Sequence, residues 1–444
     1  MRDALLLLFI IGSLAAALRY PFVGVLLWAW FTLMTPHQMA YGVFGISLNV
    51  LIAGATIVSV ALTGAWRHFR LDATIVLLVL FAFWLFVAQL NSLRPENSYQ
   101  YFDRFLKTLI FVFFALQLAT SKLKFHALVW MFVACLGYFG LKGGLFTLVT
   151  LGHYRVQGLT DTVLGDNNHL GIALATSLPM YLYLHSQATS RYARLGLIAV
   201  FVLTVVAIIG TQSRGAFVSL VVFAFYFWLR SRRKLMILGA LAALMGPAIA
   251  FMPSKWTERM STISEAENDD SFMGRVDAWV INTKLALAHP FTGVGLRNSY
   301  EKDIAATVEP NRTPRAAHSI YFEVLGGSGF VGLAIYLSLL GNAVLTTFAM
   351  QRRRDLAAAS EWTRNFCYYA QISLAVFCVG GATVSLEMWD GYMLIIALIA
   401  AAQRLAGAEG AATMTAAGRR VSWRSGARGL VQARNRPARE PSVR

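Results

Sequence analysis

The chain has 444 residues, of which 57% are hydrophobic and 14% are charged. Soluble domains carry about 45–50% apolar and about 25% charged residues, so this composition excludes an ordinary soluble protein. The net charge of +17 is typical of nucleic-acid binding. Most Lys and Arg, however, lie in the basic connectors between apolar runs, at the N-terminus and in the C-terminal tail, where they indicate topology. We therefore expect no nucleic-acid partner. Cys135, Cys367 and Cys378 lie in or beside apolar runs without a CxxC pair, which supports neither a disulfide framework nor a zinc site.

Apolar runs recur along the chain, each near the length that crosses a hydrocarbon core about 30 Å thick. The sequence therefore predicts an all-α polytopic membrane protein. Arg19-Tyr20-Pro21 interrupts the first run, and proline breaks or kinks a helix. We interpret residues 4–34 as one broken crossing; a signal peptide cleaved near Ala17 is the alternative. The twelve predicted spans are 4–34, 43–64, 74–90, 105–120, 126–146, 169–185, 194–211, 214–229, 236–252, 318–350, 366–386 and 391–403.

Charge divides the connectors into two kinds, which the positive-inside rule assigns to opposite sides of the membrane. The basic connectors are predicted to be cytoplasmic. The external connectors are predicted at 35–46, 91–104, 151–168, 211–214, 253–317 and 386–391. This division gives a membrane bundle over 1–252, a partly helical external loop over 253–317, a second bundle over 318–403 and a basic tail over 404–444. The tail holds nine Arg and two Glu, and we expect it to be disordered, cytoplasmic and close to anionic lipids.

Charged residues at membrane level are costly and are therefore candidates for function. Arg214 lies in the only polar place where the run 194–229 can turn, on the predicted outer side. It either contacts lipid phosphate or points into the protein and binds an anion. His318 begins a predicted span on the same side, where it either caps and packs the helix or transfers protons near neutral pH. Glu323 needs a partner, either His318 or an arginine of the loop.

The external loop is too long for a simple connector. Residues 273–287 are predicted to form a helix, with Arg275 and Trp279 on one face. Arg275 forms either a surface salt bridge or part of a binding site. The following glycine turn, 291–296, would let the backbone approach a ligand closely. Three further cations complete the set of candidate substrate-binding residues: Arg155, Arg104 and Lys107.

Two arginines with a histidine suit one particular chemistry. Arginine stays charged and binds phosphate oxygens in a bidentate way, so a pair of arginines suits a diphosphate. A lipid-linked sugar diphosphate is already activated, and its transfer needs charge stabilisation of the leaving group and a base for the acceptor hydroxyl. The chain has no convincing nucleotide motif and no convincing metal cage. We therefore expect no cofactor.

Several motifs together resemble the O-antigen ligase family. They are Ser213-Arg214-Gly215, the Arg275-x-x-x-Trp279 helix, the run His289 to Gly295, and His318-Ser319 followed by Gly326 to Gly332. The stretch Pro21 to Gly42 is similar to a branch of O-glycosylation ligases associated with exosortase systems. Many members have Asn after the histidine where this chain has Ser319, so no role is assigned to that position.

The resemblance implies a C-type, metal-independent glycosyltransferase of the Gram-negative inner membrane, with twelve helices and a large periplasmic loop. Such an enzyme moves a whole glycan from undecaprenyl pyrophosphate to lipid A-core and completes lipopolysaccharide. By the same resemblance, Arg214 and Arg275 bind the diphosphate and His318 is the base. Direct displacement with inversion is expected, because no carboxylate is placed for a covalent intermediate.

Three other functions remain open from the sequence. A polymerase would join the same lipid-linked repeats and differ only in its acceptor. A protein O-oligosaccharyltransferase would use a protein acceptor, which the exosortase-like N-terminus favours. A flippase or transporter would also need arginines and a lipid-sized cavity, but it would form no covalent product and would tolerate the loss of His318.

Overall fold

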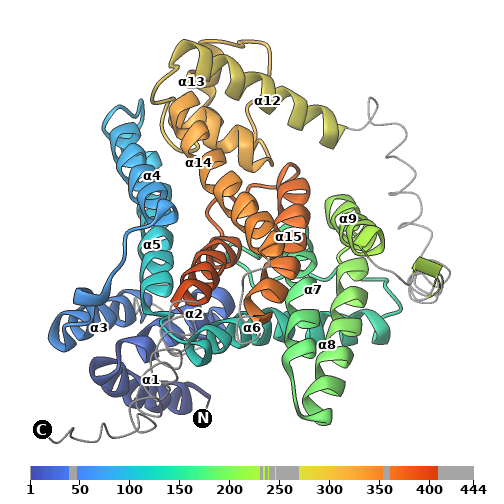
Figure 1. The fold of residues 1–444 in the computed structure, drawn as a ribbon. Helices are drawn as coiled ribbons and strands as arrows, with labels where there is room; N and C mark the ends of the chain where they lie inside the picture. Colours follow the sequence, from blue (N-terminus) through green and yellow to red (C-terminus); the bar gives the residue numbers. More distant parts are fainter. Residues whose placement is uncertain are drawn as a thin grey trace, which may run out of the picture.

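The computed structural model describes residues 2–39, 48–230, 270–353 and 361–408, together with positions 234, 235, 239 and 246. Within these ranges every regular element is helical, as the sequence predicts. The predicted span 236–252 and the first part of the predicted loop lie outside the described residues. The main helices (Figure 1) are α1 (Arg2–Arg19), α2 (Pro21–Met34), α3 (Leu48–Thr63), α4 (Ala73–Leu90), α5 (Pro95–Leu118), α6 (Lys122–Val149), α7 (Asn167–Gln187), α8 (Arg191–Gly210), α9 (Arg214–Arg230), α12 (Asp270–Ala288), α13 (Lys302–Ala306), α14 (Ile320–Arg352), α15 (Glu361–Gly381) and a C-terminal helix (Asp390–Ala408). Short 3₁₀ turns are η1 (Pro36–Met39), η2 (Ala65–His68) and η4 (Asn298–Tyr300).

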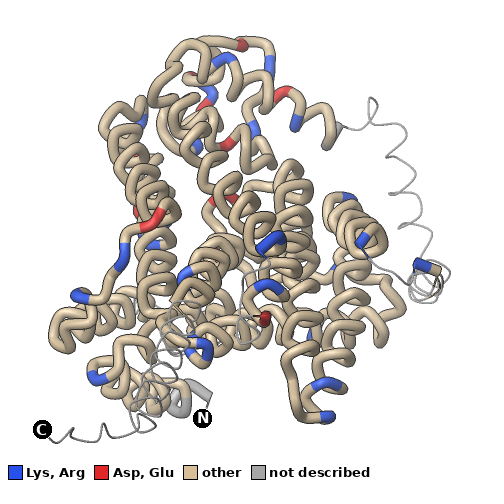
Figure 2. Tube along the Cα trace, viewed as in Figure 1, with Lys and Arg blue, Asp and Glu red and all other residues tan. Residues whose placement is uncertain are grey.

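Among the described residues, five helices are long and apolar enough to cross a membrane, namely α4, α6, α8, α14 and the C-terminal helix. The chain is therefore a multi-pass helical membrane protein, while the predicted number of crossings stays a prediction. Figure 2 shows acidic positions mixed with basic ones along the chain around α12 and α13, whereas the lower end of α8 has basic positions only. An asymmetry of this kind is what the positive-inside rule uses.

The first two helices form a hairpin. The predicted helix break is confirmed, because α1 ends at Arg19 and α2 begins at Pro21. The rings of Phe9 and Trp30 lie 5.3 Å apart although each is about ten residues from the break. The two helices therefore run back alongside each other, while the number of times that residues 4–34 cross a membrane stays a prediction. Tyr20 is extended between the helices, which lets the chain reverse.

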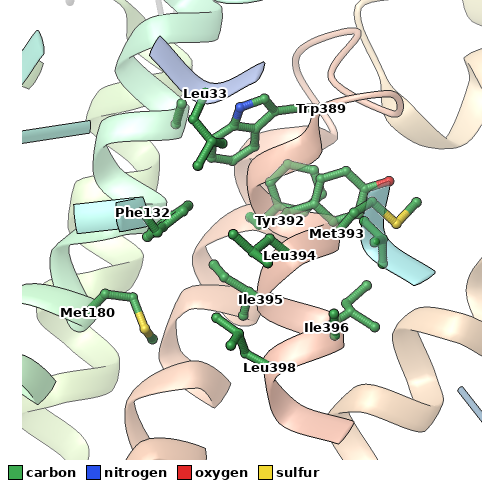
Figure 3. Packing of buried hydrophobic residues seen from close by; sticks show 14 of the residues in the cluster. Leu33, Phe132, Met180, Trp389, Tyr392, Met393, Leu394, Ile395, Ile396 and Leu398 are labelled. Carbon is green, nitrogen blue, oxygen red and sulfur yellow. The ribbon is translucent and has the colours of Figure 1, made fainter. Parts of the chain in front are cut away.

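The C-terminal helix forms the centre of the bundle. The buried share of its apolar stretch is 72%, whereas the buried share of the apolar stretch of α4 is 33%. A helix that is apolar all round belongs in such a core. Figure 3 shows its side chains packed among Leu33 of α2, Phe132 of α6 and Met180 of α7. Arg404, which the sequence assigned to the tail, belongs to this helix and forms an ion pair with Asp72 at 2.6 Å. The ion pair thereby joins the C-terminal end of this helix to the start of α4.

A glycine-rich turn after α12 packs on the backbone of α14. Val294 N–H donates to the Gly326 carbonyl at 3.0 Å, and Phe330 N–H donates to the Pro290 carbonyl at 2.9 Å. The φ angle of Gly329 is +72°, and a Cβ there would lie 2.2 Å from the Phe291 carbonyl oxygen. The turn predicted to approach a ligand instead approaches α14, because both segments lack side chains at their contact.

Gly329→Ala is expected to destabilise the protein by roughly 1–3 kcal/mol, because its φ and ψ of 72° and −174° are favourable only for glycine. Gly341→Ala in the same helix is the control, since a Cβ there meets nothing within 4 Å. Thermal unfolding in detergent should show a lower midpoint for the first variant only. Equal midpoints would show that the turn does not constrain α14.

Candidate active site

The backbone around His318 is held from two sides. The Trp279 indole Nε1 of α12 donates to the Ala317 carbonyl at 2.8 Å. The Ala317 N–H donates to Glu323 Oε1 of α14 at 3.0 Å. His318 itself has a φ of +45°, a conformation that costs of order 1–3 kcal/mol and persists only where the surroundings impose it. These two contacts therefore fix the histidine at the start of α14.

Glu323 joins three separate segments. Its Oε1 also accepts hydrogen bonds from the Tyr300 hydroxyl at 2.6 Å and the Ser385 hydroxyl at 2.7 Å. Tyr300 belongs to η4, and Ser385 lies in the loop before the C-terminal helix. Burial raises the pKa of Tyr300, and Glu323 raises it further, so the phenol keeps its proton and donates it. Among the described residues, Glu323 forms no hydrogen bond with His318 or with an arginine of the loop, although Arg297 of the loop acts on it electrostatically. Glu323 contacts the backbone next to His318 through Ala317.

A buried ion pair lies next to this network. The Arg297 guanidinium contacts Glu387 Oε1 at 3.0 Å, and their side chains are 23% and 1% exposed. Arg297 also lies over the ring of Tyr101, 4.8 Å from its centroid. The pair connects the predicted external loop to the loop before the C-terminal helix. Arg297 is also close enough to His318 to lower its pKa.

His318 lies in an environment that keeps it neutral. Burial, followed by the positive charge of Arg275, lowers the pKa of His318 to about 4. His169 and Asp166 at the start of α7 are also close enough to change this pKa. Within the described ranges, the imidazole has no hydrogen bond to another side chain. At neutral pH the ring is therefore a proton acceptor, as general-base chemistry requires.

Arg275→Gln should raise the pKa of His318, since it removes a neighbouring positive charge. The value should move toward, but not reach, 6.5, because burial is the larger cause. Diethyl pyrocarbonate modifies neutral imidazole, so the pH dependence of His318 modification, read by peptide mass spectrometry, reports this pKa. Lys284→Gln, on the same helix, is the control. An unchanged profile for Arg275→Gln would show that the two residues do not interact.

Arg214 starts α9 after a turn that α7 anchors. The predicted turn is confirmed, since α8 ends at Gly210 and α9 begins at Arg214. The Asn167 Nδ2 donates to the Thr211 carbonyl at 2.8 Å. Asn167 lies between Asp166 and His169, the two residues of α7 that act on His318. The turn before Arg214 therefore contacts the same helix terminus whose Asp166 and His169 act on His318. We call Arg214, Arg275 and His318 together the His318 centre.

The other predicted binding residues lie around this centre, in two places. The exposed Arg155 donates to Gln212 Oε1 at 3.4 Å, beside the turn before Arg214. Arg104 and Lys107 lie on α5 and border a separate cavity. Lys107 forms an ion pair with Asp103 on its own helix. The structure therefore groups Arg155 with Arg214 and separates Arg104 and Lys107 from both.

Sequence reasoning missed Arg297, Glu387 and His169. The one available signal was Glu387, an acid in a connector of six residues between two apolar runs. Its partner Arg297 is ninety residues away in sequence. Among the residues that the structure describes, no group of three or more His, Cys, Asp and Glu side chains is arranged to hold a metal ion.

Chemically, the His318 centre combines a neutral base with two permanent cations. Such a set can accept a proton from a hydroxyl and stabilise an anionic leaving group.

Comparison with known proteins agrees with this chemistry. Residues 1–189 match a family of unknown function, and no curated protein matches the chain. Residues 199–337, which hold Arg214, Arg275 and His318, match the family described as O-antigen ligase. The segment that holds Arg214, Arg275 and His318 is therefore similar to the O-antigen ligase family.

Proposed function

We propose that this protein is an O-antigen ligase that transfers a glycan from undecaprenyl pyrophosphate to lipid A-core. The observation that carries the proposal is a neutral His318 on which both Arg275 and the start of α7 act, where α7 also contacts the turn before Arg214. The family supports membrane glycosyl transfer by a ligase or polymerase in general. The donor, the acceptor, the inner membrane and a periplasmic site are our proposal, with the basic C-terminal tail in the cytoplasm.

In the proposed reaction, His318 accepts the proton of an acceptor hydroxyl. The hydroxyl oxygen forms a bond to the anomeric carbon of the glycan, while the bond from that carbon to the pyrophosphate oxygen breaks. Arg214 and Arg275 bind the departing diphosphate and stabilise its charge. A single displacement inverts the anomeric configuration.

The donor would also activate the base. Its diphosphate is negatively charged and would lie beside Arg275, which lowers the pKa of His318 in the free protein. Negative charge near an imidazole favours the protonated form, so the pKa rises when the donor binds. His318 thus becomes a stronger base only when the leaving group is in place.

Purified protein, the lipid-linked glycan and lipid A-core, mixed without divalent metal, test this function. Gel mobility should show a larger lipid A-core product for the wild type and none for Arg214→Ala or His318→Ala. A glycan that lengthens on its own lipid would show a polymerase instead. Glycan attached to a protein acceptor, with lipid A-core unchanged, would show a protein O-oligosaccharyltransferase.

A further inference from the structure

A cavity that the proposed chemistry does not use lies beside α5. It has a volume of about 650 Å³ and is bordered by α2, η1, α3, α5, residues 161–164 and the start of the C-terminal helix. We call it the α5 cavity. A cavity of several hundred cubic ångströms is large enough to hold a small ligand or part of a larger one.

Polar groups around the α5 cavity lack partners. His37 Nδ1, Gln38 Oε1, Asn49 Oδ1 and Trp389 Nε1 are buried without a hydrogen bond in the described protein, and all four residues border the cavity. Trp389 is only 2% exposed. Most buried polar groups are hydrogen-bonded. Four such groups around one cavity indicate that a ligand with both donors and acceptors belongs there.

The charges of the α5 cavity favour a hydroxyl-rich ligand over an anion. Arg104 and Lys107 are balanced by Asp103, Asp161 and Asp390, which border the same space. Lys107 is already paired with Asp103, and Asp390 acts electrostatically on Arg104. A site for phosphate would instead hold arginines whose positive charge is not compensated by nearby carboxylates. Balanced acids, amides and indoles instead match the hydroxyl groups and apolar ring faces of a saccharide.

Two contacts connect the α5 cavity to the His318 centre. Val163 borders the cavity, and its carbonyl contacts His169 Nδ1 at 2.9 Å. His169 acts in turn on His318. The second contact is the pair of Glu387 with Arg297, both of which act electrostatically on Arg104. The wall of the cavity is therefore joined to the His318 centre through Val163 and His169.

The helices that border the α5 cavity and the helix that carries Arg214 lie on different sides of α15. Arg214 is on α9, which packs on α7, α8 and α15, and Arg275 is on α12, which packs on α14. In Figure 1, α2, α3 and α5 lie to the left of α15, and α9 lies to its right. A displacement with inversion requires the nucleophile to attack from the side opposite the leaving group.

We propose that the α5 cavity binds the saccharide of the acceptor, next to the hydroxyl that attacks the donor. This inference rests on the proposed function for the identity of the acceptor. The saccharide enters from the α2, α3 and α5 side, while the donor diphosphate binds at Arg214 and Arg275.

Binding measurements test the inference without requiring catalysis. The probes are a phosphate-free oligosaccharide released from lipid A-core and undecaprenyl pyrophosphate, each titrated calorimetrically into protein in nanodiscs. Gln38→Leu and Asn49→Leu remove an amide at similar size, and Ala53→Phe fills the cavity. Asn365→Leu is the matched control, because Asn365 hydrogen-bonds Ser186 away from the cavity.

We expect the three cavity variants to weaken oligosaccharide binding at least tenfold and to leave undecaprenyl pyrophosphate binding unchanged, which also shows that they fold. The control should bind both probes as the wild type does. Unchanged oligosaccharide binding in all variants, or a selective loss of undecaprenyl pyrophosphate binding, would overturn the inference. Intact saccharide binding without any transfer would leave the cavity assigned and refute the proposed function.

Discussion

Replacement of His318 with alanine is expected to lower the rate of glycan transfer by about 10²–10⁴-fold, the usual contribution of a general base. The imidazole is neutral because burial and Arg275 lower its pKa to about 4. Its backbone is fixed by Trp279 and Glu323. Initial rates at saturating donor and acceptor measure the effect.

The control for this prediction is His153→Ala, which removes an exposed histidine whose Nδ1 contacts the Thr150 carbonyl at 2.9 Å. Its rate should equal that of the wild type. If His318→Ala retained more than a tenth of the wild-type rate, His318 would not be the base. If the His318→Ala protein still moved the lipid-linked glycan across the membrane, and neither this protein nor the wild type formed a covalent product, a flippase would be favoured.

Arg297→Ala is expected to destabilise the protein by about 3–5 kcal/mol, because it leaves a buried carboxylate without its ion-pair partner. Glu387 is 1% exposed, and water cannot replace the guanidinium. Unfolding by a detergent titration, followed by tryptophan fluorescence, measures the loss. The double variant Arg297→Met with Glu387→Gln should recover most of the stability, because both charges are removed together.

Arg94→Ala gives the matched comparison for this pair. Arg94 forms an ion pair with Asp303, and both side chains are largely exposed. Exposed ion pairs contribute little to stability, so the unfolding midpoint of the Arg94→Ala protein should stay near that of the wild type. Equal destabilisation by Arg94→Ala and Arg297→Ala, or a double variant no more stable than the single one, would contradict the buried-pair interpretation.

Local features of the site could be predicted from the sequence. The turn before Arg214 follows from two basic connectors around one apolar run, and the helix with Arg275 and Trp279 follows from its spacing. Proline also marked the end of α1 correctly. Each of these features depends on residues close together in the chain.

Long-range features could not be predicted. The hairpin of α1 and α2 depends on packing of Phe9 against Trp30, and a helix break alone does not give the angle between helices. The glycine turn fits α14 because two distant segments both lack side chains. Arg297 meets Glu387 only after the C-terminal helix has taken its place in the core. Composition and periodicity contain no information on such pairs.

Counting both products of a single reaction tests the proposed glycosyl transfer most directly. Proteoliposomes with labelled undecaprenyl-pyrophosphate glycan and lipid A-core would be quenched over time and analysed by mass spectrometry. We expect one glycan-bearing lipid A-core for each undecaprenyl pyrophosphate released, and neither product from the His318→Ala protein. Glycan that crosses the bilayer still joined to its diphosphate, with no new lipid A-core species, would contradict glycosyl transfer at this site.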